Sequence, residues 1–353
     1  MHAALTLVLS ASLLIFFSAV AIPTAEALPV LPLWFSSVLS HGRLPAAKTT
    51  TPPILCNGFA DNCSKQYSNF TVIGTHNSYA INKFSLSANQ DVSITAQLNA
   101  GIRMLQSQAH RSPNKTATGA GIDLCHTNCL LFQGGSLESY LSEVKAWVDE
   151  HPTEVISLLI VNSDDLPASR FGQAYEASGL ATKSYRPTIT NDSGIARADW
   201  PTLGDLISAD TPVVNFLASG ADLQSVPYLI DEFSSMFENA YDQTRLPFNC
   251  SVDRIASGSK PDNLMYIANH FKDSRFFGSP ILIPDKFALR KTNAREQVLA
   301  DANHCASIYG RWPTAILVDF FDWPKKKGPL TAVAQMNRTP WTSNSTGVSA
   351  GPI

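Results

Sequence analysis

Short apolar runs of strand type alternate with helix-like segments along most of this 353-residue chain. Such alternation is typical of a parallel sheet with helices packed on its faces. It predicts a single-domain α/β protein with a TIM-like (β/α)8 barrel, incomplete or distorted. A doubly wound open sheet is the alternative, although the dinucleotide-binding Gly-x-Gly-x-x-Gly is missing after the first strand. Expected strands are 70–73, 101–108, 122–125, 155–161, 212–217, 264–270 and 315–319, and expected helices are 94–100, 137–150, 200–207, 229–237 and 294–303.

Polar residues recur where the expected strands end, beginning with the run Gly-Thr-His-Asn-Ser at 74–78. In an α/β barrel the carboxyl ends of the strands converge on one mouth, where chemistry is done. We therefore expect one site assembled from residues distant in sequence. The candidates are His76, Asn77, Gln106, Gln108, His126, Asn162, Asn269, His270, Asp319 and Asp322.

His76 and His126 are the best placed of these residues, and we expect them to face each other across the mouth. Two imidazoles suit acid–base catalysis near neutral pH, since one accepts a proton while the other donates one. A nearby carboxylate would fix the tautomer of one ring, and Asp319 is the candidate. For either histidine taken alone, a structural or surface role is favoured; the catalytic interpretation depends on both lying at equivalent strand ends.

Six cysteines are present, an even number. The run Cys-His-Thr-Asn-Cys at 125–129 raises the question of zinc, but its spacing does not match a zinc knuckle and a second ligand pair is missing. We expect disulfides and no metal or cofactor. Six cysteines allow 15 pairings. Proximity in sequence favours Cys56–Cys63, Cys125–Cys129 and Cys250–Cys305.

The N-terminus reads as a targeting segment. Residues 5–21 are almost wholly apolar and small residues follow, which is typical of a signal peptide ending by residue 27. A membrane anchor is the alternative, although the run is short for a span. Residues 28–55 are expected to be a linker or pro-segment, 56–337 the barrel, and 338–353 a flexible tail without a lipid-anchor signal.

Asn-x-Ser/Thr sequons and the leader together favour a secreted, extracellular glycoprotein. The net charge of −3 offers no basic surface for nucleic acid. We expect a monomer with at most peripheral membrane contact, to which the lysine run at 325–327 would contribute weakly. The sequons start at Asn62, Asn69, Asn114, Asn191, Asn249, Asn337 and Asn344.

Several motifs together resemble the X-domain of phosphatidylinositol-specific phospholipases C, and most closely the secreted fungal phospholipase C-like phosphodiesterases. They are Gly-Thr-His-Asn-Ser-Tyr at 74–79, Gly-Ile-Arg-Met-Leu at 101–105, Leu-Cys-His at 124–126, Leu-Glu-Ser-Tyr-Leu at 137–141, Ala-Trp-Val at 146–148, Trp-Pro-Thr-Leu-Gly at 200–204 and Leu-Val-Asp-Phe at 317–320. The resemblance implies a TIM-like barrel that cleaves a phosphodiester. By it, His76 is the general base that activates a substrate hydroxyl, and His126 is the general acid that protonates the leaving alkoxide.

The chain departs from that family at charged positions. Metal-independent bacterial members carry an Asp and an Arg on the second strand, calcium-dependent relatives carry acidic ligands there, and this chain has Gln106 and Gln108. Asn77 stands where the bacterial enzymes have Asp. Arg103 or Arg111 would have to reach the phosphate instead. The alternative to an active phosphodiesterase is therefore a catalytically impaired barrel that binds a sugar phosphate or lipid head group; an inert surface protein is a third reading.

Overall fold

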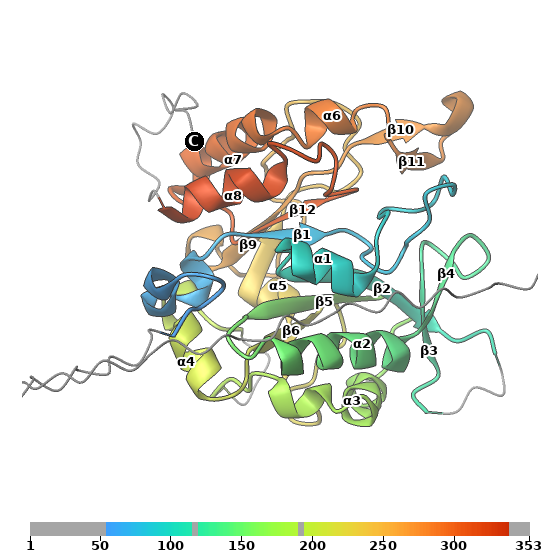
Figure 1. Cartoon of the computed structure of the whole chain (residues 1–353). Helices are drawn as coiled ribbons and strands as arrows, with labels where there is room; N and C mark the ends of the chain where they lie inside the picture. The colour runs from blue at the N-terminus through green and yellow to red at the C-terminus, as the bar shows by residue number, and fades with distance from the viewer. Residues whose placement is uncertain (1–53, 115–118, 190–193, 339–353) are drawn as a thin grey trace, which may run out of the picture. The chain divides into compact units, whose positions relative to one another are not determined.

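The computed structural model describes residues 54–114, 119–189 and 194–338. The expected signal peptide, nearly all of the expected linker, the tail beyond residue 338 and the sequons at Asn191 and Asn344 lie outside these ranges. Strands and helices alternate over the described part (Figure 1). The strands are β1 (Val72–Thr75), β2 (Met104–Arg111), β3 (Ile122–Cys125), β4 (Gln133–Ser136), β5 (Ile156–Asn162), β6 (Val213–Leu217), β7 (Leu229–Asp231), β8 (Met236–Glu238), β9 (Met265–Asn269), β10 (Asp273–Arg275), β11 (Leu282–Pro284) and β12 (Ala315–Val318).

Eight of these strands form one curled parallel sheet in the order β7-β6-β5-β2-β1-β12-β9-β8. The first strand lies at its centre, with Gly74 opposite Leu317 of β12 and Met104 of β2. Within the described residues β7 and β8 are the edges and do not pair with each other, so the barrel is incomplete. This confirms the expected barrel and excludes the doubly wound alternative, because both neighbours of β1 continue around the same curl. Antiparallel β3 and β4 extend from β2, and β10 and β11 form a separate hairpin.

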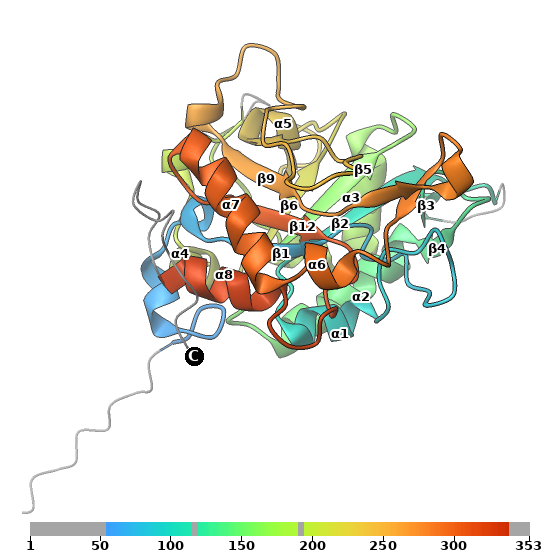
Figure 2. The ribbon, with the colours of Figure 1, turned by 90° about the horizontal axis from the view of Figure 1, so that it is seen from above.

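Helices cover the outer face of the sheet (Figure 2). The α-helices are α1 (Ile94–Ala100), α2 (Leu137–Glu150), α3 (Ala168–Ala177), α4 (Leu203–Ser208), α5 (Glu232–Ser235), α6 (Leu289–Thr292), α7 (Arg295–Tyr309) and α8 (Pro329–Arg338). Short 3-10 helices are Ala60–Ser64, Tyr67–Asn69, Leu180–Lys183, Arg197–Asp199, Pro261–Asn263 and Phe276–Gly278.

The α2 helix shows how the sequence specifies this layer. The Ser136 hydroxyl accepts from the Ser139 N–H and caps the first turn. Leu137, Leu141 and Val144 recur at helical spacing and are fully buried against the outer face of the sheet. Each such side chain contributes about 1.5–3 kcal/mol on burial, so the position of the helix follows from this stripe.

A second apolar cluster fills the inside of the curl. It includes Met104, Leu159, Phe216, Ile267 and Leu317 from successive strands. These residues alternate with those that face the helices, as a period of two requires. The barrel interior is therefore a packed core below the mouth.

The segment 229–237, expected to be helical, is the main error in the expected elements. It contains β7, the single turn α5 and β8. The Asp231 side chain caps α5 by accepting from the Ser234 N–H, and Met236 is already extended with φ −140° and ψ 161°. Its apolar residues belong to two strands of the barrel wall, where burial on both faces imitates a helix pattern. Helices α3 and α8 and the hairpin β10–β11 were not expected.

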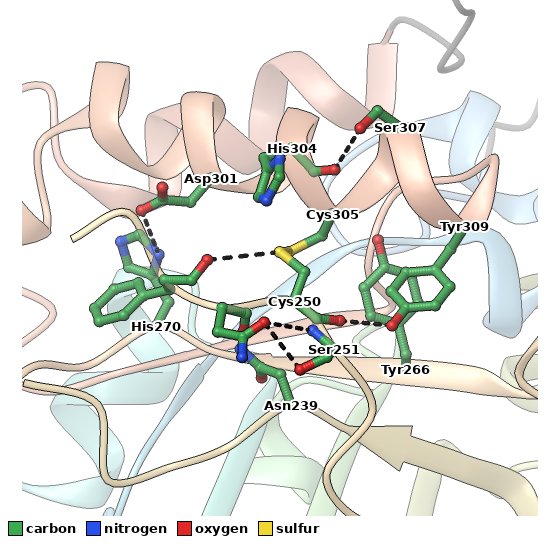
Figure 3. Close-up of a disulfide and its surroundings, with 12 residues drawn as sticks. Asn239, Cys250, Ser251, Tyr266, His270, Asp301, His304, Cys305, Ser307 and Tyr309 are labelled. Carbon is green, nitrogen blue, oxygen red and sulfur yellow. Dashed lines mark hydrogen bonds and ion pairs between the residues drawn. A yellow bond between two sulfur atoms is a disulfide. The ribbon is translucent and has the colours of Figure 1, made fainter. Parts of the chain in front are cut away.

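The three expected disulfides are present: Cys56–Cys63, Cys125–Cys129 and Cys250–Cys305. Because cysteines 125 and 129 are bonded to each other, they offer no thiolate to zinc. Cys250–Cys305 joins the loop after β8 to α7 (Figure 3). Among the described residues, no helix has the length and apolar character to span a bilayer.

Candidate active site

His76 stands at the carboxyl end of β1, and its backbone N–H donates to the Val318 carbonyl at 3.1 Å. The strand can come this close to its neighbours because Gly74 lacks a side chain. A Cβ there would collide with Leu317 and lie 3.1 Å from the Met104 Cβ. The glycine of the Gly-Thr-His motif therefore serves packing, and the histidine that follows is carried to the mouth of the barrel.

The His76 ring is held on both nitrogens. Nδ1 lies 2.9 Å from Oδ1 of Asp319, a carboxylate that is only 2% exposed. Asn89 donates to the same oxygen at 2.9 Å, and the Asn77 amide nitrogen lies 3.1 Å from Nε2. A carboxylate acceptor fixes the proton on Nδ1, which leaves the lone pair of Nε2 as proton acceptor. The ring also stacks on Phe271 at a centroid distance of 3.9 Å.

His126 faces this ring edge-on, with 6.3 Å between the centroids. Its Nδ1 donates to the Ser87 carbonyl at 2.5 Å, so Nε2 is the exchangeable position. Burial is the main reason why the pKa of His126 is lowered, and the neighbouring His76 lowers it further. The hydrogen bond to the Ser87 carbonyl and the charge of Asp319 act in the opposite direction. The sequence prediction that the two histidines meet across the mouth agrees with this geometry; their catalytic roles remain predictions.

Gln106 and Gln108 each anchor the turn that follows one histidine. Oε1 of Gln106 accepts from the Asn77 N–H at 2.7 Å. Oε1 of Gln108 accepts from the Thr127 N–H at 3.0 Å, where Thr127 has a φ of +63°. Both glutamines therefore face the mouth as expected, but their carbonyl oxygens are committed to the protein backbone.

A cavity of about 340 Å³ opens beside His76. Its polar lining includes His76, Gln106, Gln108, Glu238, Arg254 and Asn269. A larger cavity of about 580 Å³ lies at the amino ends of the strands, where Val72 and Arg103 line it. Since it is at the opposite end of β1 from His76, it does not belong to this site.

Three predicted substrate ligands are not in the mouth. Arg103 precedes β2, and its guanidinium pairs with Glu154 at 2.7 Å and donates to the Leu98 carbonyl at 2.8 Å. It sits at the wrong end of the strand to contact a substrate. Asn162 is at the right end, but its amide closes a loop by donating to the carbonyls of Leu166 and Ser219.

His270 is the third correction (Figure 3). It directly follows β9, yet its ring points to the outer face, where Nε2 donates to the Thr292 carbonyl at 2.7 Å. Nδ1 lies 3.5 Å from Asp301 of α7. Asn269 faces the interior, so the period of two sends the next side chain outward. Burial lowers the pKa of His270, which is consistent with a neutral packing residue.

Several site residues were not predicted from the sequence. Asn89 is fully buried against Asp319, and Phe271 supports the His76 ring. Asp273 is another such residue: burial, and then the nearby charge of Asp319, raise its pKa to about 7. Glu238 lies one residue beyond the segment expected to be helical, and Arg254 lies in a loop without a pattern. Among the described residues, no group of three or more His, Cys, Asp or Glu is arranged to hold a metal ion.

The fold and the site define a barrel with paired histidines at the carboxyl ends of its parallel strands. The family model described as PI-PLC X matches residues 62–333. The chain is 39% identical to the PI-PLC X domain-containing protein 1 of Arthroderma benhamiae, over 82% of this chain and 92% of that protein. The chain therefore belongs to the PI-PLC X-domain family.

More distant comparisons agree in fold. A protein of Arthroderma benhamiae named only as an uncharacterized secreted protein is 34% identical, over 83% of this chain and 65% of that protein. The solved F249X mutant of the phosphatidylinositol-specific phospholipase C from Staphylococcus aureus superposes with a TM-score of 0.52 at 14% identity, covering 78% of this chain and 95% of that one. The Listeria monocytogenes enzyme gives 0.50 at 13%, over 78% and 96%.

Proposed function

We propose that this protein is a secreted phosphoric diester hydrolase that cleaves a phosphodiester by acid–base catalysis between His76 and His126. The observation that carries the proposal is the Asp319–His76 pair with His126 facing it at 6.3 Å. One ring has a lone pair held ready, and the other is placed to give a proton. General acid–base catalysis of this kind contributes about 10²–10⁴-fold to a rate.

The chemistry follows from the positions of the two Nε2 atoms. A substrate hydroxyl next to the phosphodiester replaces the Asn77 amide at His76 Nε2 and loses its proton there. Its oxygen attacks phosphorus and forms a cyclic phosphodiester. The bond from phosphorus to the other oxygen breaks, and His126 gives that oxygen a proton. The lowered pKa of free His126 means that the anionic substrate has to favour its protonated form.

Exposed apolar side chains favour a lipid as the source of this phosphodiester. They occur on the loop after β1, on the β3–β4 connection and in and after the β10–β11 hairpin, which lie on the same side of the barrel in both views (Figures 1 and 2). Exposed apolar side chains on neighbouring loops are suited to inserting into the surface of a membrane. The residues are Phe84, Leu86, Leu130, Leu131, Phe277, Ile281 and Phe287. The substrate class we infer is a phosphoinositide or glycosyl-phosphoinositide. The protein would reach it as a monomer that contacts the membrane peripherally.

Secretion is supported by the leader-like N-terminus, by the three disulfides and by the name of one relative. The second candidate function is binding without turnover of a sugar phosphate or lipid head group. It is favoured by Gln106 and Gln108, whose carbonyl oxygens anchor backbone and bring no charge to the mouth.

Hydrolysis of phosphatidylinositol vesicles and of a soluble inositol phosphodiester by the purified protein tests the proposal, with and without chelator. We expect turnover that survives chelation and falls about 10²–10⁴-fold in His76→Ala and in His126→Ala. His304→Ala, which changes an exposed histidine of α7, is the matched control. A folded wild-type protein that binds the soluble substrate and never turns it over would favour the binding function.

A further inference from the structure

The mouth cavity has a single candidate to meet a negative charge. A phosphodiester is an anion, and charge gathers on its non-bridging oxygens during phosphoryl transfer. Of the described residues that line the cavity, Arg254 is the only lysine or arginine. A second cation, Lys286, lies near Asp319. Its ammonium donates to the Ser85 carbonyl at 3.0 Å, and Lys286 does not line the cavity.

Arg254 is held rigidly by the strand beside it. Its N–H donates to the Glu238 carbonyl at 3.2 Å, and its own carbonyl accepts from the Glu238 N–H at 3.0 Å. Nη2 pairs with the Glu238 carboxylate, and the guanidinium lies over the rings of Phe233 and Tyr241 at 5.4 and 4.7 Å. A planar guanidinium fixed in this way loses little freedom when it binds an anion.

The same guanidinium keeps donors in reserve. Its Nε is buried and has no partner among the described residues, while the side chain as a whole is 33% exposed. Arginine binds phosphate oxygens through paired N–H groups, so one edge can serve Glu238 and another a ligand.

Two carboxylates, Glu238 and Glu232, lie near Arg254, but only one of them is charged. Glu238 accepts a further hydrogen bond from the Asn269 amide at 3.1 Å. Burial, and then the nearby charge of Glu238, raise the pKa of Glu232 well above its ordinary value. A neutral Glu232 leaves Glu238 as the one charged carboxylate among the described residues that line the cavity.

We propose that Arg254 binds the phosphodiester anion in the mouth cavity and supplies, from the loop after β8, the positive charge that Gln106 and Gln108 do not. The inference rests on the proposed function and names the residue that positions its substrate. It places the phosphate between the His76 side of the cavity and β8. The substrate is then bound by a cation that belongs to neither histidine turn.

The test compares Arg254→Gln and Arg254→Lys with Arg245→Gln, which alters an exposed arginine outside the cavity lining. On the soluble inositol phosphodiester we expect kcat/KM to fall about 10²–10³-fold in Arg254→Gln, as for other fixed donors to a developing charge. Arg254→Lys should recover part of the loss and Arg245→Gln should match wild type. Activity of Arg254→Gln within about twofold of wild type would overturn the inference while leaving the proposed function intact.

Two further measurements separate the possible failures. Because Arg254→Gln leaves Glu238 without its partner, the double variant Glu238→Gln/Arg254→Gln is compared with Glu238→Gln alone, and the same loss is expected between them. If wild type turns over neither substrate, the proposed function fails, and titration with dimethyl phosphate followed by NMR decides the anion site. Weaker binding by Arg254→Gln than by wild type supports it, and equal or absent binding by both overturns it.

Discussion

The side-chain oxygen of Gln108 accepts a hydrogen bond from the backbone N–H of Thr127, 3.0 Å away. Thr127 follows His126 directly, inside the loop closed by Cys125–Cys129. Gln108, on β2, thus orients the turn that carries His126, whereas the disulfide closes the loop without fixing the orientation of that turn. Gln108 is thereby part of the scaffold of the mouth.

Substitution of Gln108 should separate this anchoring from charge. Gln108→Ala removes the acceptor, and we expect kcat to fall about tenfold with little change in KM, because a lost hydrogen bond of about 1 kcal/mol loosens His126. Gln108→Glu keeps an acceptor and adds a negative charge to the cavity, so KM should rise instead. Steady-state kinetics on a soluble substrate distinguish the two. Identical effects of both changes would argue against an anchoring role.

Asp319→Asn tests the tautomer of His76. The asparagine keeps the shape but offers a weaker acceptor and a possible donor to Nδ1, so Nε2 is no longer reserved for accepting a proton. We expect kcat to drop by about 10²-fold or more with a nearly unchanged KM. The thermal unfolding midpoint of the variant serves as the control for folding. An unchanged kcat would remove Asp319 from the mechanism.

Asp273 should make stability depend on pH. Burial and Asp319 raise its pKa to about 7 in the folded protein, above the unfolded value of about 3.9. The folded state then holds the extra proton between these values, so the favourable contribution is complete below about pH 4 and is lost as pH rises through 7. Asp273→Asn should therefore be more stable than wild type at pH 8 and not at pH 4. Full linkage would give about 4 kcal/mol, and we expect about 1–2 because the side chain keeps partial solvent contact. Urea denaturation at both pH values measures it; a gain at pH 4 alone would reverse the assignment.

The apolar rim should control binding to vesicles. Phe277 and Phe287 are 94% and 103% exposed, and burying a phenylalanine contributes about 1.5–3 kcal/mol. Replacing either with serine should weaken partitioning onto phosphatidylinositol vesicles by about tenfold or more, without slowing turnover of a soluble substrate. Ile308→Ser, at an exposed apolar residue of α7, is the matched control. Equal loss in the control would point to a general effect of hydrophobicity.

The described sequons should not be equally glycosylated. The amide nitrogens of Asn62 and Asn337, where sugar would attach, donate internally to the carbonyls of Cys56 and Thr71 at 3.1 and 2.8 Å. Asn249 is exposed, and its side-chain oxygen accepts from the Ser251 N–H at 2.9 Å, which leaves its nitrogen outward. We expect glycan at Asn249 and none at Asn62 and Asn337. Glycopeptide mass spectrometry of the secreted protein checks this, and full occupancy at Asn62 would contradict it.

Sequence reasoning located the site where a strand ended in a chemically distinctive residue. His76 and Asp319 follow apolar runs, and the geometry of a parallel sheet brings such ends together. The direction of a side chain was harder to predict. His270 lies one residue beyond Asn269, and one residue reverses the face. Arg103 directly precedes β2, at the end of that strand remote from the mouth. Arg254 lies in a loop without periodicity, so only the folded chain shows which strand it joins.

The unpaired edge between β7 and β8 affects how this protein can change. A strand inside a closed barrel cannot shift without altering the register of both neighbours, whereas β9 is the one described strand that pairs with β8, and the other side of β8 is bridged only by the loop at Arg254. Glu238 and the loop that it anchors lie on this edge. The width of the mouth can therefore be altered by substitutions around β8 while the strands that carry the histidines keep their alignment. Under the proposed function, we expect substitutions in this wall to alter selectivity for larger or smaller head groups more than folding stability, and this wall is where a directed-evolution library for new substrates should begin.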